Sequence, residues 1–197
     1  SMLEAYEILD HFKAYEFVFS QPQVPLSEEL LINTHAIVME NTIRFTKGYE
    51  PGEYTKTQMA AGDTIFPDHE ISIQSVPQLM VQTQQALEEG KVHPLILSAK
   101  FHKYFIYLHP FPDGNGRLAR LFSNLILVKF DHPIVIIKSE QKERYIEALK
   151  NSHKYQDMDI ITAFFISVAI DRMEYELKSI ASNDGKTKIG KGPGFIF

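Results

Sequence analysis

Residues 109–120 read HPFPDGNGRLAR, and this stretch decides how the chain is interpreted. It combines a histidine, a carboxylate, a turn with two glycines and two arginines, and a strongly apolar segment follows it. The first amides of a helix lack hydrogen-bond partners, and the helix dipole makes that end positive. A glycine turn that opens a helix therefore favours an anion, and the two arginines make a polyphosphate the expected ligand.

An ordinary turn is the alternative, because Asp-Gly and Asn-Gly are both favoured hairpin dipeptides. Arg117 and Arg120 favour the anion site instead. They lie three residues apart and so share one face of the first helical turn. Two cations beside the positive end of a helix repel each other unless an anion compensates them. A nucleoside triphosphate would supply that anion.

His109 and Asp113 are the candidate chemical groups of the stretch. A histidine with an ordinary pKa of about 6.5 suits a base that accepts a proton from an attacking hydroxyl. A purely structural histidine is the alternative. Asp113 either shapes the turn or binds Mg²⁺, which prefers one or two carboxylates together with water and phosphate oxygens. The remaining histidines show no close metal-ligand spacing, so we predict no metal site built from protein groups alone.

The composition is that of one globular domain. Of 197 residues, 44% are apolar and 23% charged, and the net charge of −5 argues against a general nucleic-acid-binding surface. The chain has no cysteine, which excludes disulfides, thiolate metal sites and a cysteine nucleophile. No signal peptide is visible, and the longest uncharged apolar run, Ile160 to Ile170, is too short for a bilayer. We expect a soluble, cytoplasmic protein that binds neither membrane nor nucleic acid.

Apolar residues recur with helical spacing along most of the chain. This periodicity predicts helices over residues 3–19, 27–46, 76–89, 94–108, 117–130, 139–151 and 159–180. In the first, Tyr6, Leu9 and Phe12 belong to the expected apolar face, and the helix from 117 has so little polar face that it should be buried at the centre.

The region between 48 and 70 differs, because glycines and prolines interrupt it. Gly62-Asp63 suits a two-residue type II′ turn, so we predict a small β-hairpin here. The expected fold is all-α, a helical bundle carrying one hairpin. A single domain should cover residues 1–182, with an N-terminal helix over 2–20, a core over 26–182 and a glycine- and lysine-rich tail over 183–197.

The stretch 109–120 resembles the signature of the Fic family, histidine-x-phenylalanine-x-aspartate-glycine-asparagine-glycine-arginine-x-x-arginine, at every specified position. The resemblance extends over about residues 3–180 and implies a Fic-like helical bundle with a hairpin flap. Fic domains typically transfer AMP from ATP to a hydroxyl of a target protein. This implies ATP as co-substrate, Mg²⁺ as cofactor and a protein partner with an exposed Ser, Thr or Tyr.

Each position of the signature carries an implied role. His109 would deprotonate the target hydroxyl, and Asp113 would hold Mg²⁺ against the phosphates. Arg117 would contact the phosphate chain near the β position and Arg120 the γ-phosphate. The anion hole would consist of Gly114, Asn115 and Gly116.

Two further elements gain expected roles. The hairpin, as a flap over about 57–66, would pair with an extended target segment and present its hydroxyl to the base. The flap residues singled out for this docking are Thr57, Thr64, Ile65 and Phe66. Tyr145 is the candidate wall of a nucleotide pocket. An ordinary surface hairpin is the alternative for the flap.

The chain departs from the family in two respects. Thr55 replaces an arginine that many relatives carry. No Ser/Thr-x-x-x-Glu-Gly/Asn inhibitory pattern is found, since Glu40-Asn41 follows Ala36 where the pattern needs a hydroxyl. The alternatives are an inhibitory helix upstream of Met2, a separate antitoxin-like partner, or no inhibition of this type.

Other activities of the same site remain as alternatives to adenylyl transfer. They are removal of AMP, transfer of another nucleotide or of phosphocholine, and, from a different class, nucleotide binding without turnover. The Gly116-Arg117 pair argues against a Fic-related kinase, and the His109–Asp113 combination argues against a pure binding module.

Overall fold

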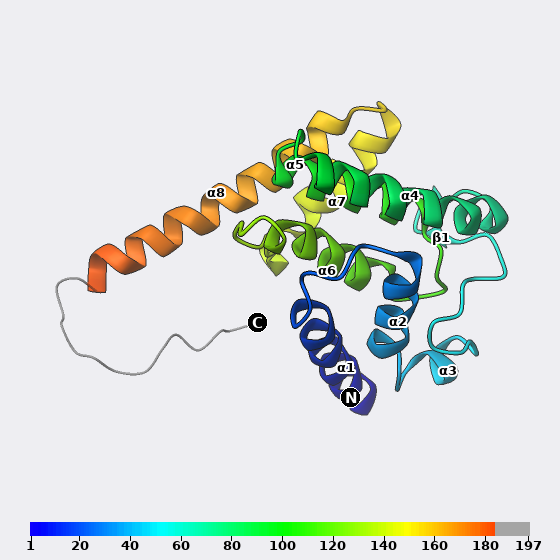
Figure 1. The fold of residues 1–197 in the computed structure, drawn as a ribbon. Helices are drawn as coiled ribbons and strands as arrows, with labels where there is room; N and C mark the ends of the chain where they lie inside the picture. The colour runs from blue at the N-terminus through cyan, green and yellow to red at the C-terminus, as the bar shows by residue number, and fades with distance from the viewer. Residues whose placement is uncertain (184–197) are drawn as a thin grey trace.

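The computed structural model describes residues 1–183, and it is a helical bundle with one small hairpin (Figure 1). The elements, in chain order, are α1 (Met2–Phe19), α2 (Glu28–Val38), α3 (Ile43–Thr46), β1 (Ala60–Ala61), β2 (Thr64–Ile65), α4 (His69–Glu89), α5 (Pro94–Leu108), α6 (Asn115–Val128), the 3₁₀ turn η1 (Ser139–Gln141), α7 (Lys142–Lys154) and α8 (Met158–Asn183). The all-α prediction is confirmed. Residues 184–197 of the predicted tail lie outside the described part.

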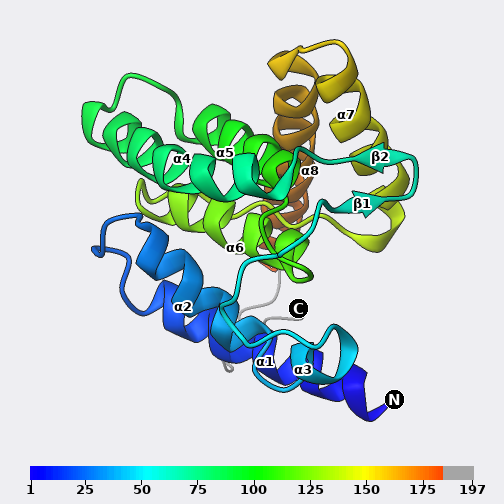
Figure 2. The ribbon, with the colours of Figure 1, turned by 90° about the vertical axis from the view of Figure 1, so that its right-hand side faces the viewer.

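Helix α6 is the central element, as its sequence predicted. In Figure 2 it lies between the α1–α2 pair and the α4–α5 pair, and α5 packs along it. Phe101 and Phe105 of α5 and Phe122 of α6 are all but inaccessible to solvent. The Phe101 ring stacks on both others, with its centroid 5.7 Å from that of Phe105 and 5.9 Å from that of Phe122. This aromatic contact fixes α5 against α6 and so places the turn that joins them.

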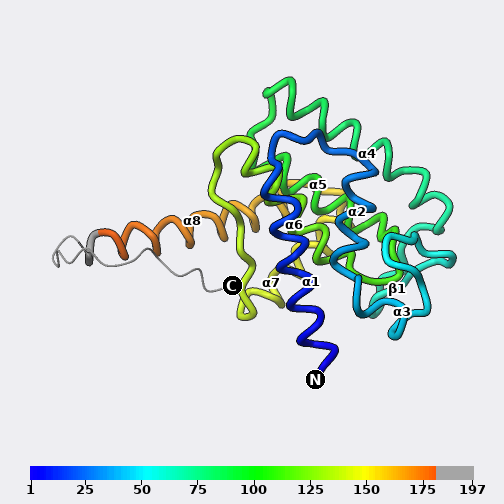
Figure 3. The backbone as a smooth tube through the Cα atoms, turned by 60° about the horizontal axis from the view of Figure 1, so that its bottom comes forward, coloured from blue at the N-terminus to red at the C-terminus, as the bar shows by residue number. Residues whose placement is uncertain are grey.

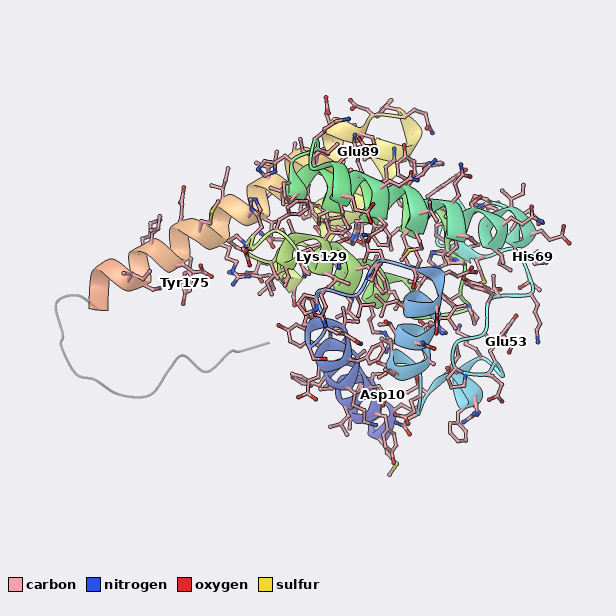
Figure 4. The ribbon with its side chains drawn as sticks, viewed as in Figure 1. Asp10, Glu53, His69, Glu89, Lys129 and Tyr175 are labelled. Atoms are coloured by element: carbon pink, nitrogen blue, oxygen red, sulfur yellow. The ribbon has the colours of Figure 1, made fainter. Side chains whose placement is uncertain are left out.

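Helix α1 runs across α2 and α6 (Figure 3), but the face that it buries differs from the expected one. The buried residues are Asp10, Ala14 and Val18, whereas Leu9 is 56% exposed. Asp10, labelled in Figure 4, is drawn inward because its two carboxylate oxygens accept hydrogen bonds from the backbone and side-chain amides of Asn41, at 2.9 and 2.6 Å.

The Asp10 carboxylate also explains why the segment predicted as one helix over 27–46 forms two helices. The prediction of a continuous helix over 27–46 is wrong, since α2 ends at Val38 and the short α3 begins at Ile43. The backbone N–H of Asn41 donates to Asp10 instead of to a carbonyl one turn earlier. A tertiary contact thus interrupts a locally favourable pattern.

Helix α4 starts seven residues earlier than predicted. Asp68 caps it, with its carboxylate accepting from the amide of Glu70 at 2.9 Å, and Pro77 lies inside the helix. Gly90 ends it in the left-handed conformation, as expected. The predicted helix over 139–151 begins with η1 and continues as α7 to Lys154.

The hairpin is confirmed around Gly62-Asp63. Ala60 pairs with Ile65 and Ala61 with Thr64 in antiparallel register, and Gly62 has a φ of +57°. Within the described residues, no helix is long and apolar enough to span a membrane. The second half of α8 projects away from the bundle (Figures 1 and 3).

Candidate active site

The turn between α5 and α6 is closed by one buried amide. The Asn115 side chain accepts a hydrogen bond from the Phe111 amide at 3.1 Å and donates one to the Phe111 carbonyl at 2.7 Å. Asn115 is 2% exposed and Phe111 is fully buried. Two hydrogen bonds between buried groups therefore hold the turn closed.

Gly114 is the residue that this turn requires. Its φ is +79°, which costs an L-residue free energy, and a Cβ there would lie 3.0 Å from the sulfur of Met39. Its amide donates to the Asp113 carboxylate at 2.6 Å. Gly114 thus lets the chain enter α6 in contact with the end of α2.

The first amides of α6 are free to bind an anion. The first helical hydrogen bond runs from the Leu118 amide to the Gly114 carbonyl, so the amides of 115–117 have no partner within the helix. Their shared direction and the helix dipole make this end of α6 electropositive. The structure brings the three predicted anion-hole residues together at this helix end.

The two arginines flank that end in different ways. Arg117 reaches the Val38 carbonyl and the Met39 sulfur on α2, and its guanidinium lies 3.8 Å from the Asp113 carboxylate. Arg120 turns back along the helix, with Nη1 3.4 Å from where a Cβ on Gly116 would stand. Within the described residues, Arg120 forms no ion pair.

The hydrogen bond that His109 makes fixes which of its ring nitrogens carries the proton. It ends α5 with a φ of +47°, and its Nδ1 lies 3.2 Å from the Ile106 carbonyl. Because a carbonyl only accepts, Nδ1 must carry the proton, which leaves Nε2 with a free lone pair. Burial lowers the pKa of the imidazole below its usual 6.5, outweighing the opposing effects of the Ile106 hydrogen bond and the Asp113 charge. The neutral, proton-accepting form is therefore favoured at neutral pH.

His35 braces the turn from α2. Its Nδ1 accepts from the Gly52 amide at 2.9 Å, so Nε2 donates to the Asp113 carbonyl at 3.2 Å, and its ring stacks on Phe111 with centroids 3.8 Å apart. Burial lowers its pKa to about 4. The role of His35 could not be predicted from the sequence, because its partner Asp113 lies 78 positions away.

Thr55, two residues before the flap, and Phe66, at the end of the flap, contact this region. The Thr55 amide donates to the Pro110 carbonyl at 2.9 Å, and the Phe66 ring stacks on the His109 ring at 3.9 Å. Of the predicted docking residues, Thr57 and Ile65 are exposed and Thr64 is half-buried, but Phe66 is only 7% exposed. Phe66 thus faces the base instead of the solvent.

A chain of hydrogen bonds fixes the position of the Tyr145 hydroxyl. Its hydroxyl lies 2.7 Å from His102 Nε2, His102 Nδ1 lies 3.2 Å from the Ser123 hydroxyl, and that hydroxyl donates to the Ser98 carbonyl at 3.3 Å. Because the Ser123 hydroxyl proton is donated to the Ser98 carbonyl, His102 Nδ1 donates a hydrogen bond to the Ser123 oxygen. His102 Nε2 therefore accepts a hydrogen bond from the Tyr145 hydroxyl. Burial lowers the pKa of His102 to about 3 and raises that of Tyr145 to about 12.

The same tyrosine lines a cavity of about 340 Å³ next to the second arginine. The residues around this cavity come from α6, η1 with its flanks, and α7: Arg120, Ile137, Lys138, Ser139, Lys142, Tyr145 and Ile146.

Asp113 suits a metal site in which most ligands come from outside the protein. One carboxylate oxygen accepts from Gly114, and among the described residues there is no cluster of three or more histidine, cysteine or acidic groups. A single half-exposed carboxylate suits Mg²⁺ when phosphate oxygens and water supply the other ligands. Asp113 would hold such an ion beside the phosphates, where it would neutralise negative charge.

Comparisons with known proteins agree with this arrangement. The model of the Fic/DOC family matches residues 25–127. A protein adenylyltransferase Fic of Nematostella vectensis is 30% identical over 156 residues, 78% of this chain but only 35% of that relative. A Fic-domain signalling protein of Bacteroides thetaiotaomicron has the same fold, with a TM-score of 0.78 and 23% identity, covering 87% of this chain and 71% of its own. IbpAFic2, solved in complex with adenylylated Cdc42, has a TM-score of 0.63 and 19% identity over 82% of this chain and 54% of its own.

Gly114→Ala should destabilise the protein more than Gly90→Ala. Both glycines are left-handed, but a Cβ at Gly90 meets open space, whereas one at Gly114 meets Met39. We expect a loss of about 1 kcal/mol at Gly90 and about 2 kcal/mol or more at Gly114. Urea unfolding of both variants measures this, and equal losses would show that the turn does not need close packing.

Stability should fall on mild acidification. The folded pKa of His35 is about 4, below the usual 6.5, so between these values the unfolded chain binds more protons than the folded one. The free energy of unfolding should therefore drop as the pH falls from about 6.5 toward about 4. His35→Gln should weaken this dependence, measured by urea unfolding across the range. An unchanged slope in the variant would contradict the assignment.

Proposed function

The chain belongs to the Fic/DOC family, and from that premise we propose that it transfers AMP from ATP to a hydroxyl side chain of a protein substrate, releasing pyrophosphate. The observation that carries the proposal is the free lone pair of His109 Nε2, held beside an uncompensated anion site at the start of α6. The adenylyltransferase name of the Nematostella relative and the adenylylated Cdc42 bound to IbpAFic2 support the same reaction.

The reaction is a displacement at the α-phosphorus of ATP. The target hydroxyl oxygen forms a bond to that phosphorus as its proton passes to His109 Nε2. The bond from phosphorus to the oxygen that bridges the α- and β-phosphates breaks, and pyrophosphate leaves with both electrons. The chain's task is to orient the phosphates and neutralise their charge, which suits fixed amides and arginines.

The residues around the turn have different roles in this proposed reaction. The amides of 115–117 bind phosphate oxygens at the end of α6, and Arg120, which forms no ion pair in the described structure, is available to the far end of the phosphate chain. The hydrogen bond to the Ile106 carbonyl keeps the proton on His109 Nδ1. Thr57 and Ile65 of the flap, which are exposed, would contact the target.

Label transfer tests the reaction. With Mg²⁺, ATP labelled at the α-phosphate should label the protein or a target, and ATP labelled at the γ-phosphate should not. His109→Ala should abolish transfer, a loss of roughly 10²-fold or more, while ATP binding persists. His132→Ala, beyond the C-terminal end of α6, is the control. Transfer of the γ-label would overturn adenylyl transfer, and ATP binding without any transfer would favour a binding module.

The pH dependence of transfer follows from the His109 pKa. Because burial holds that pKa below 6.5, the base stays neutral at pH 7 and the rate falls only when the pH drops below 6.5. We expect a profile that is level above pH 7 with its acid limb below 6.5. A limb centred above 6.5 would mean that His109 is not the titrating base.

A further inference from the structure

The cavity beside Tyr145 is lined by three cations and no carboxylate. They are Arg120 of α6, Lys138 just before η1 and Lys142 at the start of α7. In the described part of the chain, none of the three forms an ion pair. Positive charges around a concave site raise the local concentration of anions.

Arg120 connects this cavity with the start of α6. Its Nη1 lies 3.4 Å from where a Cβ on Gly116 would stand, and the same side chain lines the cavity. An anion that Arg120 binds in this cavity would therefore also face Lys138 and Lys142. The terminal phosphate of a nucleoside triphosphate carries the charge that such a group of cations selects.

The rest of the lining contributes little polar recognition. Ile137 and Ile146 are apolar, and the Tyr145 hydroxyl is engaged by His102 at 2.7 Å. Apart from the Ser139 side chain, charge is therefore the main means by which this cavity selects a ligand.

Lys138 and Lys142 differ in whether another side chain contacts the ammonium group. The Lys138 ammonium lies 5.9 Å from the centre of the Tyr175 ring on α8, a cation–π distance, so it must leave that ring to reach the cavity. Lys142 has no acidic or aromatic partner within the described structure. Lys142 should thus contribute more.

We propose that Lys142, assisted by Lys138, binds the terminal phosphate of the nucleotide and makes the site selective for triphosphates. This rests on the proposed function, because it extends the same donor site. The role is one of binding and selection, and neither lysine contacts the reacting phosphorus.

Calorimetric titration with ATP, ADP and AMP, each with Mg²⁺, tests the proposal. Lys142→Ala should weaken ATP binding about tenfold, ADP binding less and AMP binding hardly at all. Lys138→Ala should have a smaller effect, and Lys142→Arg should restore most of the ATP affinity. Lys150→Ala is the matched control, since it removes the same charge from an exposed position of α7 outside the cavity.

The outcomes are separable. ATP affinity in Lys142→Ala equal to that of Lys150→Ala, or an equal loss for ATP and AMP, would overturn the inference and leave adenylyl transfer standing. A wild-type protein that binds no nucleotide would overturn the proposed function itself. Thermal unfolding of each variant shows whether a loss reflects binding or folding, and Lys142 is exposed, so we expect unchanged stability.

Discussion

Two hydrogen bonds between the Asn115 side chain and the backbone of Phe111 hold the turn on which the site depends. These bonds stabilise the turn in which His109 and Gly114, five residues apart, adopt the strained left-handed backbone conformation. With them, α5 ends and α6 begins within one compact turn. The base and the free amides of the next helix then lie at the same end of the bundle, and both are fixed before any ligand arrives.

Three histidines show how burial and partners divide one residue type into different roles. His35 and His102 use both ring nitrogens in hydrogen bonds, and burial keeps them neutral as structural bridges. His109 uses only one nitrogen for structure, which leaves the other for chemistry. At the start of α6, Arg117 lies 3.8 Å from the Asp113 carboxylate and Arg120 forms no ion pair among the described residues. A bound polyphosphate would lower the electrostatic free energy of this uncompensated positive charge.

Local features were predictable from the sequence. The turn and the central helix follow from twelve consecutive residues and the apolar periodicity of the segment after them. Tertiary contacts were not. Asp10 breaks a helix 31 positions away, and Phe66 covers the ring of His109 although its sequence context suggested an exposed flap. Such pairs depend on how α1, α2 and the hairpin pack, and no periodic pattern encodes that packing.

Nuclear magnetic resonance of the backbone amides tests the central claim most directly, namely that the start of α6 is a preformed phosphate site. Addition of ATP with Mg²⁺ should shift the amide signals of Asn115 and Gly116 strongly, as expected for amides that donate to phosphate oxygens, and adenosine should leave them in place. Shifts of equal size with both ligands, or saturation by ATP without movement of these signals, would show that the phosphates bind elsewhere.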